Sequence, residues 1–139
     1  PLLLGIAAGS VTAVSVALIS AWALGASIPS ILSLAPKSVT TPIAMGIAQV
    51  TAGLPSLAAA IVIVTGIVGA VLGPWLLNRL GIRDPEAHGV ALGTAAHGIG
   101  TARAFQEGEE TGTFSGVAMG LNGIVTALLL PWMLLWLFG

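Results

Sequence analysis

Charged residues and cysteine are scarce in this sequence. Of its 139 residues, 6% are charged, none is cysteine, and four basic residues stand against five acidic ones. The lack of cysteine excludes disulfides and thiolate metal sites, and the balanced charge excludes the basic surface that nucleic-acid binding needs. With 56% hydrophobic residues and a mean hydropathy of +1.05, the chain has the composition of an integral membrane protein.

Long uncharged runs predict membrane-spanning helices. Three segments, Leu2–Leu24, Leu54–Leu77 and Phe114–Phe138, are each long and apolar, and about 20 apolar residues at ~1.5 Å per residue cross a bilayer core of ~30 Å. Tryptophans near the end of the third segment suit the membrane interface. We therefore predict an all-α, multi-span helical bundle that forms a single transmembrane domain over residues 1–139.

Two further apolar segments contain helix breakers. Ile28–Val50 is interrupted by Pro36 and Pro42, and Ala87–Phe105 is interrupted by Gly98 and Gly100. Non-helical backbone is tolerated at membrane depth only where protein or water satisfies its polar groups, and paired broken helices are the best sequence sign of a transporter site. We expect two broken helices, each of which either re-enters or crosses the membrane.

The two broken segments resemble each other at a displacement of 60 residues. This displacement aligns Lys37 with His97 and Thr41 with Thr101, and it predicts an internal repeat. If each broken segment is a re-entrant hairpin, the two copies have inverted orientation. If each segment crosses the membrane, the copies run parallel.

Two weaker patterns bear on orientation and packing. Arg79 and Arg83 lie in the connection 78–86, which the positive-inside rule places in the cytoplasm. Small residues at four-residue spacing allow close helix packing within the chain, the favoured interpretation, or a seam between two copies. The glycines of this pattern are Gly5, Gly9, Gly69, Gly73, Gly112, Gly116 and Gly120.

The first break has the residue types of an anion site. Lys37 offers a positive charge, and Ser38, Thr40 and Thr41 offer hydroxyls beside the predicted start of a helix, where free backbone amides favour negative charge. A small carboxylate fits this combination. The alternative is that the Lys37 side chain extends to the interface beside an ordinary turn.

The second break adds a second basic side chain. Gly98 and Gly100 permit unusual backbone conformations, and Thr101 is predicted to cap the helix that carries Arg103. Arginine is suited to bidentate carboxylate contact, although Arg103 also stands four residues before Glu107 and has the spacing of an intrahelical ion pair. Both interpretations of Arg103 stay open.

His97 and Asn122 are the remaining polar candidates. With an ordinary pKa of ~6.5, His97 is the predicted proton-coupling group, or else a hydrogen-bonded helix contact. Asn122 stands alone in an apolar span and is expected to bond across helices, with ligand binding second. The full predicted substrate site is Lys37, Ser38, Thr40, Thr41, Thr94, His97, Gly98, Gly100, Thr101, Arg103 and Asn122.

Four strings of this sequence resemble the LrgB/CidB membrane protein family. They are PKSVTTPIA at 36–44, GAVLGP at 69–74, GTAAHGIGTARA at 93–104 and FSGVAMGLNG at 114–123. The family includes the plastid glycolate/glycerate translocator. Family members carry further N-terminal spans, so the resemblance implies that this chain is the C-terminal portion of a longer protein.

The resemblance implies a protein of the bacterial inner membrane. Its implied function is transport of a small monocarboxylate of the glycolate, glycerate or pyruvate class. The alternative is an antiholin-like or holin-like protein that modulates murein hydrolase export and autolysis without a carboxylate site. A homo-oligomer and a small LrgA/CidA-type membrane partner are further expectations. No nucleophile, carboxylate pair or metal constellation is visible, so neither enzymatic activity nor a cofactor is expected.

Overall fold

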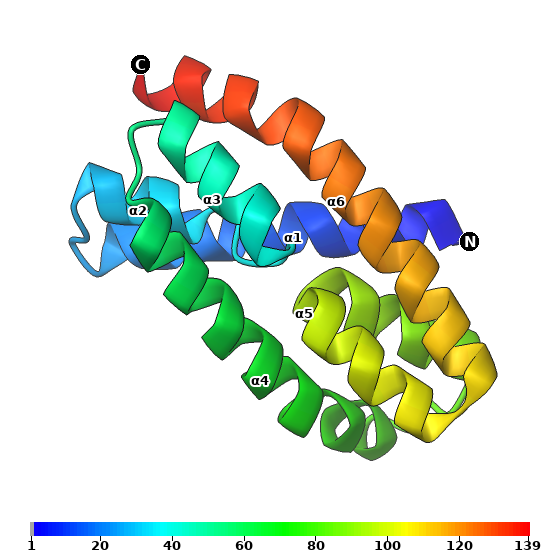
Figure 1. Ribbon diagram of the computed structural model, residues 1–139. Coiled ribbons are helices and arrows are strands. Elements are labelled where there is room, and N and C mark those ends of the chain that lie inside the picture. The colour runs from blue at the N-terminus through cyan, green and yellow to red at the C-terminus, as the bar shows by residue number, and fades with distance from the viewer. Residues whose placement is uncertain (1) are drawn as a thin grey trace.

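The computed structural model describes residues 2–139, which form six helices and no strand (Figure 1). This confirms the predicted all-α class. Helices α1, α4 and α6 are long and apolar enough to cross a membrane, as the three uncharged runs predict. The helices are α1 (Leu2–Ala23), α2 (Ile28–Leu34), α3 (Thr41–Val50), α4 (Pro55–Arg79), α5 (Pro85–Glu107) and α6 (Glu109–Phe138).

The outer surface is apolar, as the bilayer requires. Large hydrophobic side chains are exposed along α1, α4 and α6, and Trp132 and Trp136 are 75% and 83% exposed. The inside is built mainly from small residues, with compact clusters of larger side chains around α3. One cluster joins Leu32 and Ile47 to Leu134 of α6. A protein with apolar groups outside and close-packed small residues inside matches the way helices associate in lipid.

Helices α2 and α3 fold back on each other as a helical hairpin, here called the first hairpin. Ile28 at the start of α2 and Val50 at the end of α3 line one pocket together with Leu134 and Phe138. The Leu54 amide, just before α4, also donates to the Ser33 hydroxyl at 2.7 Å. The base of the first hairpin therefore lies beside the C-terminal end of α6, and its tip is formed by residues 35–40.

Helix α5 is also folded back on itself and is here called the second hairpin. His97 has non-helical backbone angles of φ 42° and ψ −133°. His88 Nδ1 lies 3.0 Å from Glu107 Oε2, whereas 19 residues of straight helix would separate these positions by roughly 28 Å. The base of this hairpin shares a cleft with Thr111. It therefore lies beside the N-terminal end of α6, opposite to the base of the first hairpin.

Each hairpin follows a long helix, α1 or α4, and the bases of the two hairpins lie at opposite ends of α6. Both hairpins have 23 residues, and they are displaced by 57 residues, from 28 to 85 and from 50 to 107. Paired units of inverted direction are a common transporter plan. A displacement of 57 differs from the 60 expected from sequence, so the internal repeat stays a prediction.

Close packing explains most of the small-residue pattern. A Cβ added at Gly9 would lie 3.0 Å from Thr94, and one added at Gly69 would lie 2.5 Å from Ala96. The first arm of the second hairpin, residues 85–96, therefore packs directly on α1 and α4. Gly116 and Gly120, in contrast, face open space. The expected packing role is wrong for these two glycines, because no atom of residues 2–139, apart from the adjacent backbone of α6, lies within 4 Å of a Cβ added at either position.

Candidate functional site

Asn122 of α6 joins the tips of both hairpins. Its Nδ2 atom donates to the Ser38 carbonyl at 3.1 Å and to the Thr94 carbonyl at 3.3 Å. The Ser10 hydroxyl of α1 donates to Asn122 Oδ1. Asn122 is 2% exposed and lies near the middle of the 30-residue α6. One amide therefore satisfies one carbonyl near the tip of each hairpin, which is the interhelical role expected for Asn122.

Lys37 lies beside this junction at the tip of the first hairpin. Its side chain is partly buried and Nζ donates to the Ser38 hydroxyl at 3.1 Å. Neither of the two ion pairs found among residues 2–139 includes Lys37. A cation without a carboxylate partner is costly at membrane depth, so the position favours an anionic ligand.

Threonine hydroxyls surround the same region. Thr40 is the N-cap residue of α3, and its hydroxyl makes no hydrogen bond to the helix end. Thr41 is the first residue of α3 and is partly buried. Thr94 is buried and its Oγ1 atom has no hydrogen-bond partner in the described part of the chain. A buried hydroxyl without a partner costs about 1–3 kcal/mol, so Thr94 is a place where a ligand oxygen would stabilise the protein.

His97 forms the turn of the second hairpin and is buried. Its Nε2 atom lies 3.0 Å from the Val62 carbonyl of α4, and a neutral imidazole that carries its proton on Nε2 satisfies this contact. A Cβ added at Gly66 would lie 2.7 Å from the His97 ring. The contact is that of a structural histidine, and proton coupling at His97 stays a prediction.

The residues that follow His97 serve mainly to close the hairpin. A Cβ at Gly100 would collide with the Leu92 carbonyl of the first arm, so Gly100 is needed for the close approach of the two arms, while Gly98 is exposed. Thr101 donates to the His97 carbonyl at 2.9 Å and shares a hydrogen bond with Ser115. The predicted capping role of Thr101 is wrong, because the residue already lies inside the second arm.

Arg103 belongs to a different cluster. Its guanidinium lies 3.6 Å from Glu107 Oε1 and 3.4 Å from Gln106 Oε1, toward the base of the second hairpin. It lines a cleft with Arg83 and His88. The structure thus brings Lys37, Ser38, Thr94 and Asn122 into one junction but gives Arg103 the intrahelical ion pair that its spacing allows.

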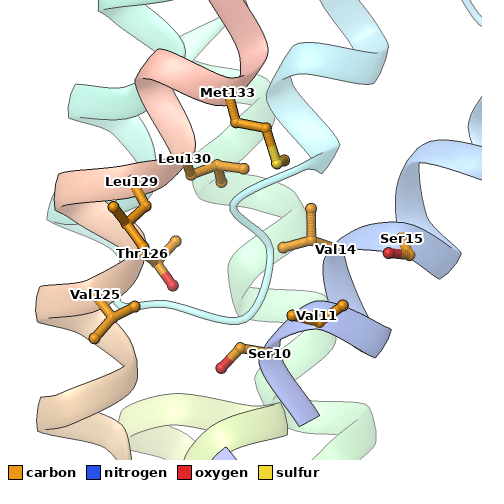
Figure 2. Close-up of a pocket in the computed structure, with 9 residues that line it drawn as sticks. All are labelled: Ser10, Val11, Val14, Ser15, Val125, Thr126, Leu129, Leu130 and Met133. Carbon is orange, nitrogen blue, oxygen red and sulfur yellow. The ribbon is translucent and has the colours of Figure 1, made fainter. Parts of the chain in front are cut away.

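Figure 2 shows an apolar groove between α1 and α6. It has a volume of about 180 Å³ and is lined mainly by aliphatic side chains such as Val14 and Leu130. Two polar residues of the lining, Ser10 and Thr126, also hydrogen-bond to Asn122. The groove therefore has a polar end at the point where the hairpin tips meet.

Sequence reasoning did not single out Ser10, nor the contact between His88 and Glu107. Ser10 is a lone hydroxyl in an apolar span and could have been found by the criterion that singled out Asn122. The contact between His88 and Glu107 depends on the reversal of α5 and has no local sequence signal. Among residues 2–139, no three His, Asp or Glu side chains gather to hold a metal ion.

The comparisons with known proteins agree on one family. Residues 1–136 match the LrgB-like family. Over 96% of this chain, the sequence is 43% identical to YwbG of Bacillus subtilis. Over 94% of this chain, it is 32% identical to the antiholin-like protein LrgB of Bacillus cereus. Over 80% of this chain, it is 32% identical to the holin-like protein CidB of Staphylococcus epidermidis. No solved structure matches.

The match covers only part of each relative. The chain spans 59% of the length of YwbG, 56% of LrgB and 48% of CidB. Three apolar helices and a family match over nearly the whole chain identify an integral membrane protein. The chain belongs to the LrgB-like family.

Proposed function

We propose that the full-length protein moves small monocarboxylates across the membrane and that the hairpin junction holds the carboxylate. One observation supports this proposal above all. Two hairpins of opposite direction meet on Asn122, halfway along a helix that is long enough to span the bilayer. Non-helical backbone at that depth is tolerated where it lines a cavity or is buried in protein. Transporters place substrate sites where such broken helices meet.

The chemistry of the junction suits a carboxylate better than a neutral or cationic solute. Lys37 supplies an unpaired positive charge, and α3 begins directly after Thr40, so its first backbone amides lie at the same tip. The Thr94 hydroxyl can donate to a hydroxy or keto oxygen of the substrate. These groups match the glycolate, glycerate or pyruvate class.

Uptake into liposomes tests this proposal. Full-length protein is reconstituted and supplied with radiolabelled glycolate, glycerate or pyruvate. We expect Lys37→Gln to lower uptake by about 10-fold or more, because a hydrogen bond to a charged group contributes about 1.5–3 kcal/mol. Arg79→Gln, at the exposed end of α4, is the matched control and should keep normal uptake. Equal uptake by folded Lys37→Gln protein would refute the proposal.

An antiholin-like role is the second candidate. The names of two relatives favour it, and on the comparisons alone it has more support than carboxylate transport. The open faces at Gly116 and Gly120 are available to another helix, such as a second copy or an LrgA/CidA-type partner. In this role the protein would modulate murein hydrolase export from the bacterial inner membrane.

One variant separates the two candidates. Autolysis and murein hydrolase activity are measured in a bacterium that lacks its own LrgB-type protein and carries either the unmodified protein or Lys37→Gln. If the Lys37→Gln protein loses uptake but restores normal autolysis, the two roles are independent. If it loses both, control of autolysis depends on the carboxylate site.

A further inference from the structure

His88 lies at the base of the second hairpin with both ring nitrogens engaged. Nδ1 lies 3.0 Å from Glu107 Oε2, and Nε2 lies 2.7 Å from the Ile82 carbonyl. The imidazole side chain is 8% exposed. One ring thus connects three segments, namely the connection before α5, the first arm of α5 and the end of its second arm.

The two contacts require one proton more than a neutral ring carries. A backbone carbonyl can only accept a hydrogen bond, and an ionised carboxylate can only accept as well. A neutral imidazole has one N–H and can satisfy one of these two acceptors. Both bonds form together only if His88 is an imidazolium or if Glu107 is protonated.

The neighbouring charges place this proton on the imidazole. Arg103 lies 3.6 Å from the other oxygen of Glu107, so a positive charge already stands beside this carboxylate. Asp84 adds negative charge near the ring, while Arg83 and Arg103 line the same cleft as His88. The α4 and α6 residues that line this cleft are Pro74, Asn78 and Thr111, none of which titrates.

The pKa of His88 changes in the direction that this arrangement requires. Burial alone would lower it, but the hydrogen bonds with Glu107 and the Ile82 carbonyl, together with the charges of Glu107 and Asp84, raise the pKa above the ordinary value of 6.5. The ring therefore holds its proton in a pH range where a free histidine loses it.

We propose that His88 and Glu107 form a proton-binding site that holds the base of the second hairpin closed. With the proton bound, both arms and the preceding connection are tied to one ring. When the proton leaves, one of the two hydrogen bonds is lost and the base loosens. The site is independent of the carboxylate junction and is distinct from His97, whose single contact needs no added proton.

Nitrogen NMR of the full-length protein tests the site directly. The described chain has only two histidines, so ¹⁵N-histidine labelling with His88→Gln and His97→Gln variants assigns the signals of both rings. We expect both His88 nitrogens to be protonated at pH 6.5 and the His97 ring to be neutral. Glu107→Gln should lower the pKa of His88, because the carboxylate charge is removed. Glu109→Gln, which removes a nearby carboxylate that does not contact His88, should leave the pKa unchanged.

Hydrogen exchange tests the closing role. The exchange of backbone amides at both ends of α5 is compared between the unmodified protein and Glu107→Gln at the same pH. Above the pKa of His88, these amides should exchange faster in the unmodified protein than in the variant. The side-chain amide that Glu107→Gln introduces can donate to a neutral ring, so this variant keeps both bonds without the proton. A neutral His88 ring at pH 6.5, or equal exchange in both proteins at every pH, would overturn the proposal.

Discussion

At the scale of single residues, two buried polar side chains satisfy backbone groups where helices end or reverse. Asn122 bonds to the Ser38 and Thr94 carbonyls, and Ser33 accepts the Leu54 amide. In lipid these groups have no water to bond with, so each needs a protein partner. These buried polar side chains therefore bond to backbone groups at places where helices end or reverse.

Replacement of Asn122 should weaken the junction. Asn122→Leu leaves the Ser38 and Thr94 carbonyls without their amide donor, which should cost about 1–3 kcal/mol and lower the thermal unfolding midpoint in detergent. Thr126→Val removes a longer contact of 3.4 Å to the same side chain and should have a smaller effect. Equal midpoints for the two variants would contradict a central role for Asn122.

Stability should also depend on pH through His88. Because the folded-state pKa is raised, the stabilisation is fully present below about 6.5, the ordinary value, and is lost as the pH rises through the folded-state pKa. The difference in unfolding midpoint between the unmodified protein and His88→Gln should therefore be largest at low pH and shrink at high pH. A difference that is constant from pH 5 to 9 would argue against a bound proton.

At the scale of elements, hydropathy predicts the three long helices well and the hairpins poorly. The sequence places the third span at Phe114, whereas α6 begins at Glu109. The two acidic residues in the first turn of α6 favour a helix N-terminus. Because they are charged, a hydropathy criterion leaves them out of the apolar run and predicts a later start. The fold-back of α5 brings Gly89 and Gly93 against the backbone of α6, and hydropathy carries no information on such contacts.

The glycines of α5 and α6 provide a matched test of this packing. Gly93→Ala would push a methyl group into the Ser115 backbone of α6, while Gly116→Ala meets no atom within 4 Å. Overpacking typically costs about 1–3 kcal/mol, so Gly93→Ala should lower the unfolding midpoint clearly and Gly116→Ala should not. If Gly116→Ala alone disrupts an oligomer on a sizing column, the open face of α6 is a subunit contact.

At the scale of the whole molecule, the two hairpins enter from opposite ends of the bundle. The first has its base beside the C-terminal end of α6, and the second has its base beside the N-terminal end. Since α6 is long enough to span a membrane, the two bases are expected on opposite membrane surfaces. Their tips then meet between the two surfaces, at the buried Asn122 side chain.

Cysteine labelling tests this arrangement. The described chain has no cysteine, so single cysteines at Ser27 and Gln106, both exposed at hairpin bases, report the side of each base. A membrane-impermeant maleimide added to intact cells should label Ser27→Cys but not Gln106→Cys, because the connection 78–86 is predicted to be cytoplasmic. Labelling of both positions from one side would show that the hairpins do not oppose each other.

The sequence alone determined the membrane class, the three spans and the positions of the helix breakers, because hydropathy and the conformational limits of proline and glycine are local properties. Only the tertiary structure decided that Asn122 joins the two breaks, that Arg103 pairs with Glu107, and that His88 meets Glu107 across the hairpin. These contacts depend on where the chain reverses direction. A reversal changes which distant residues meet while leaving the local pattern of apolar and polar residues the same.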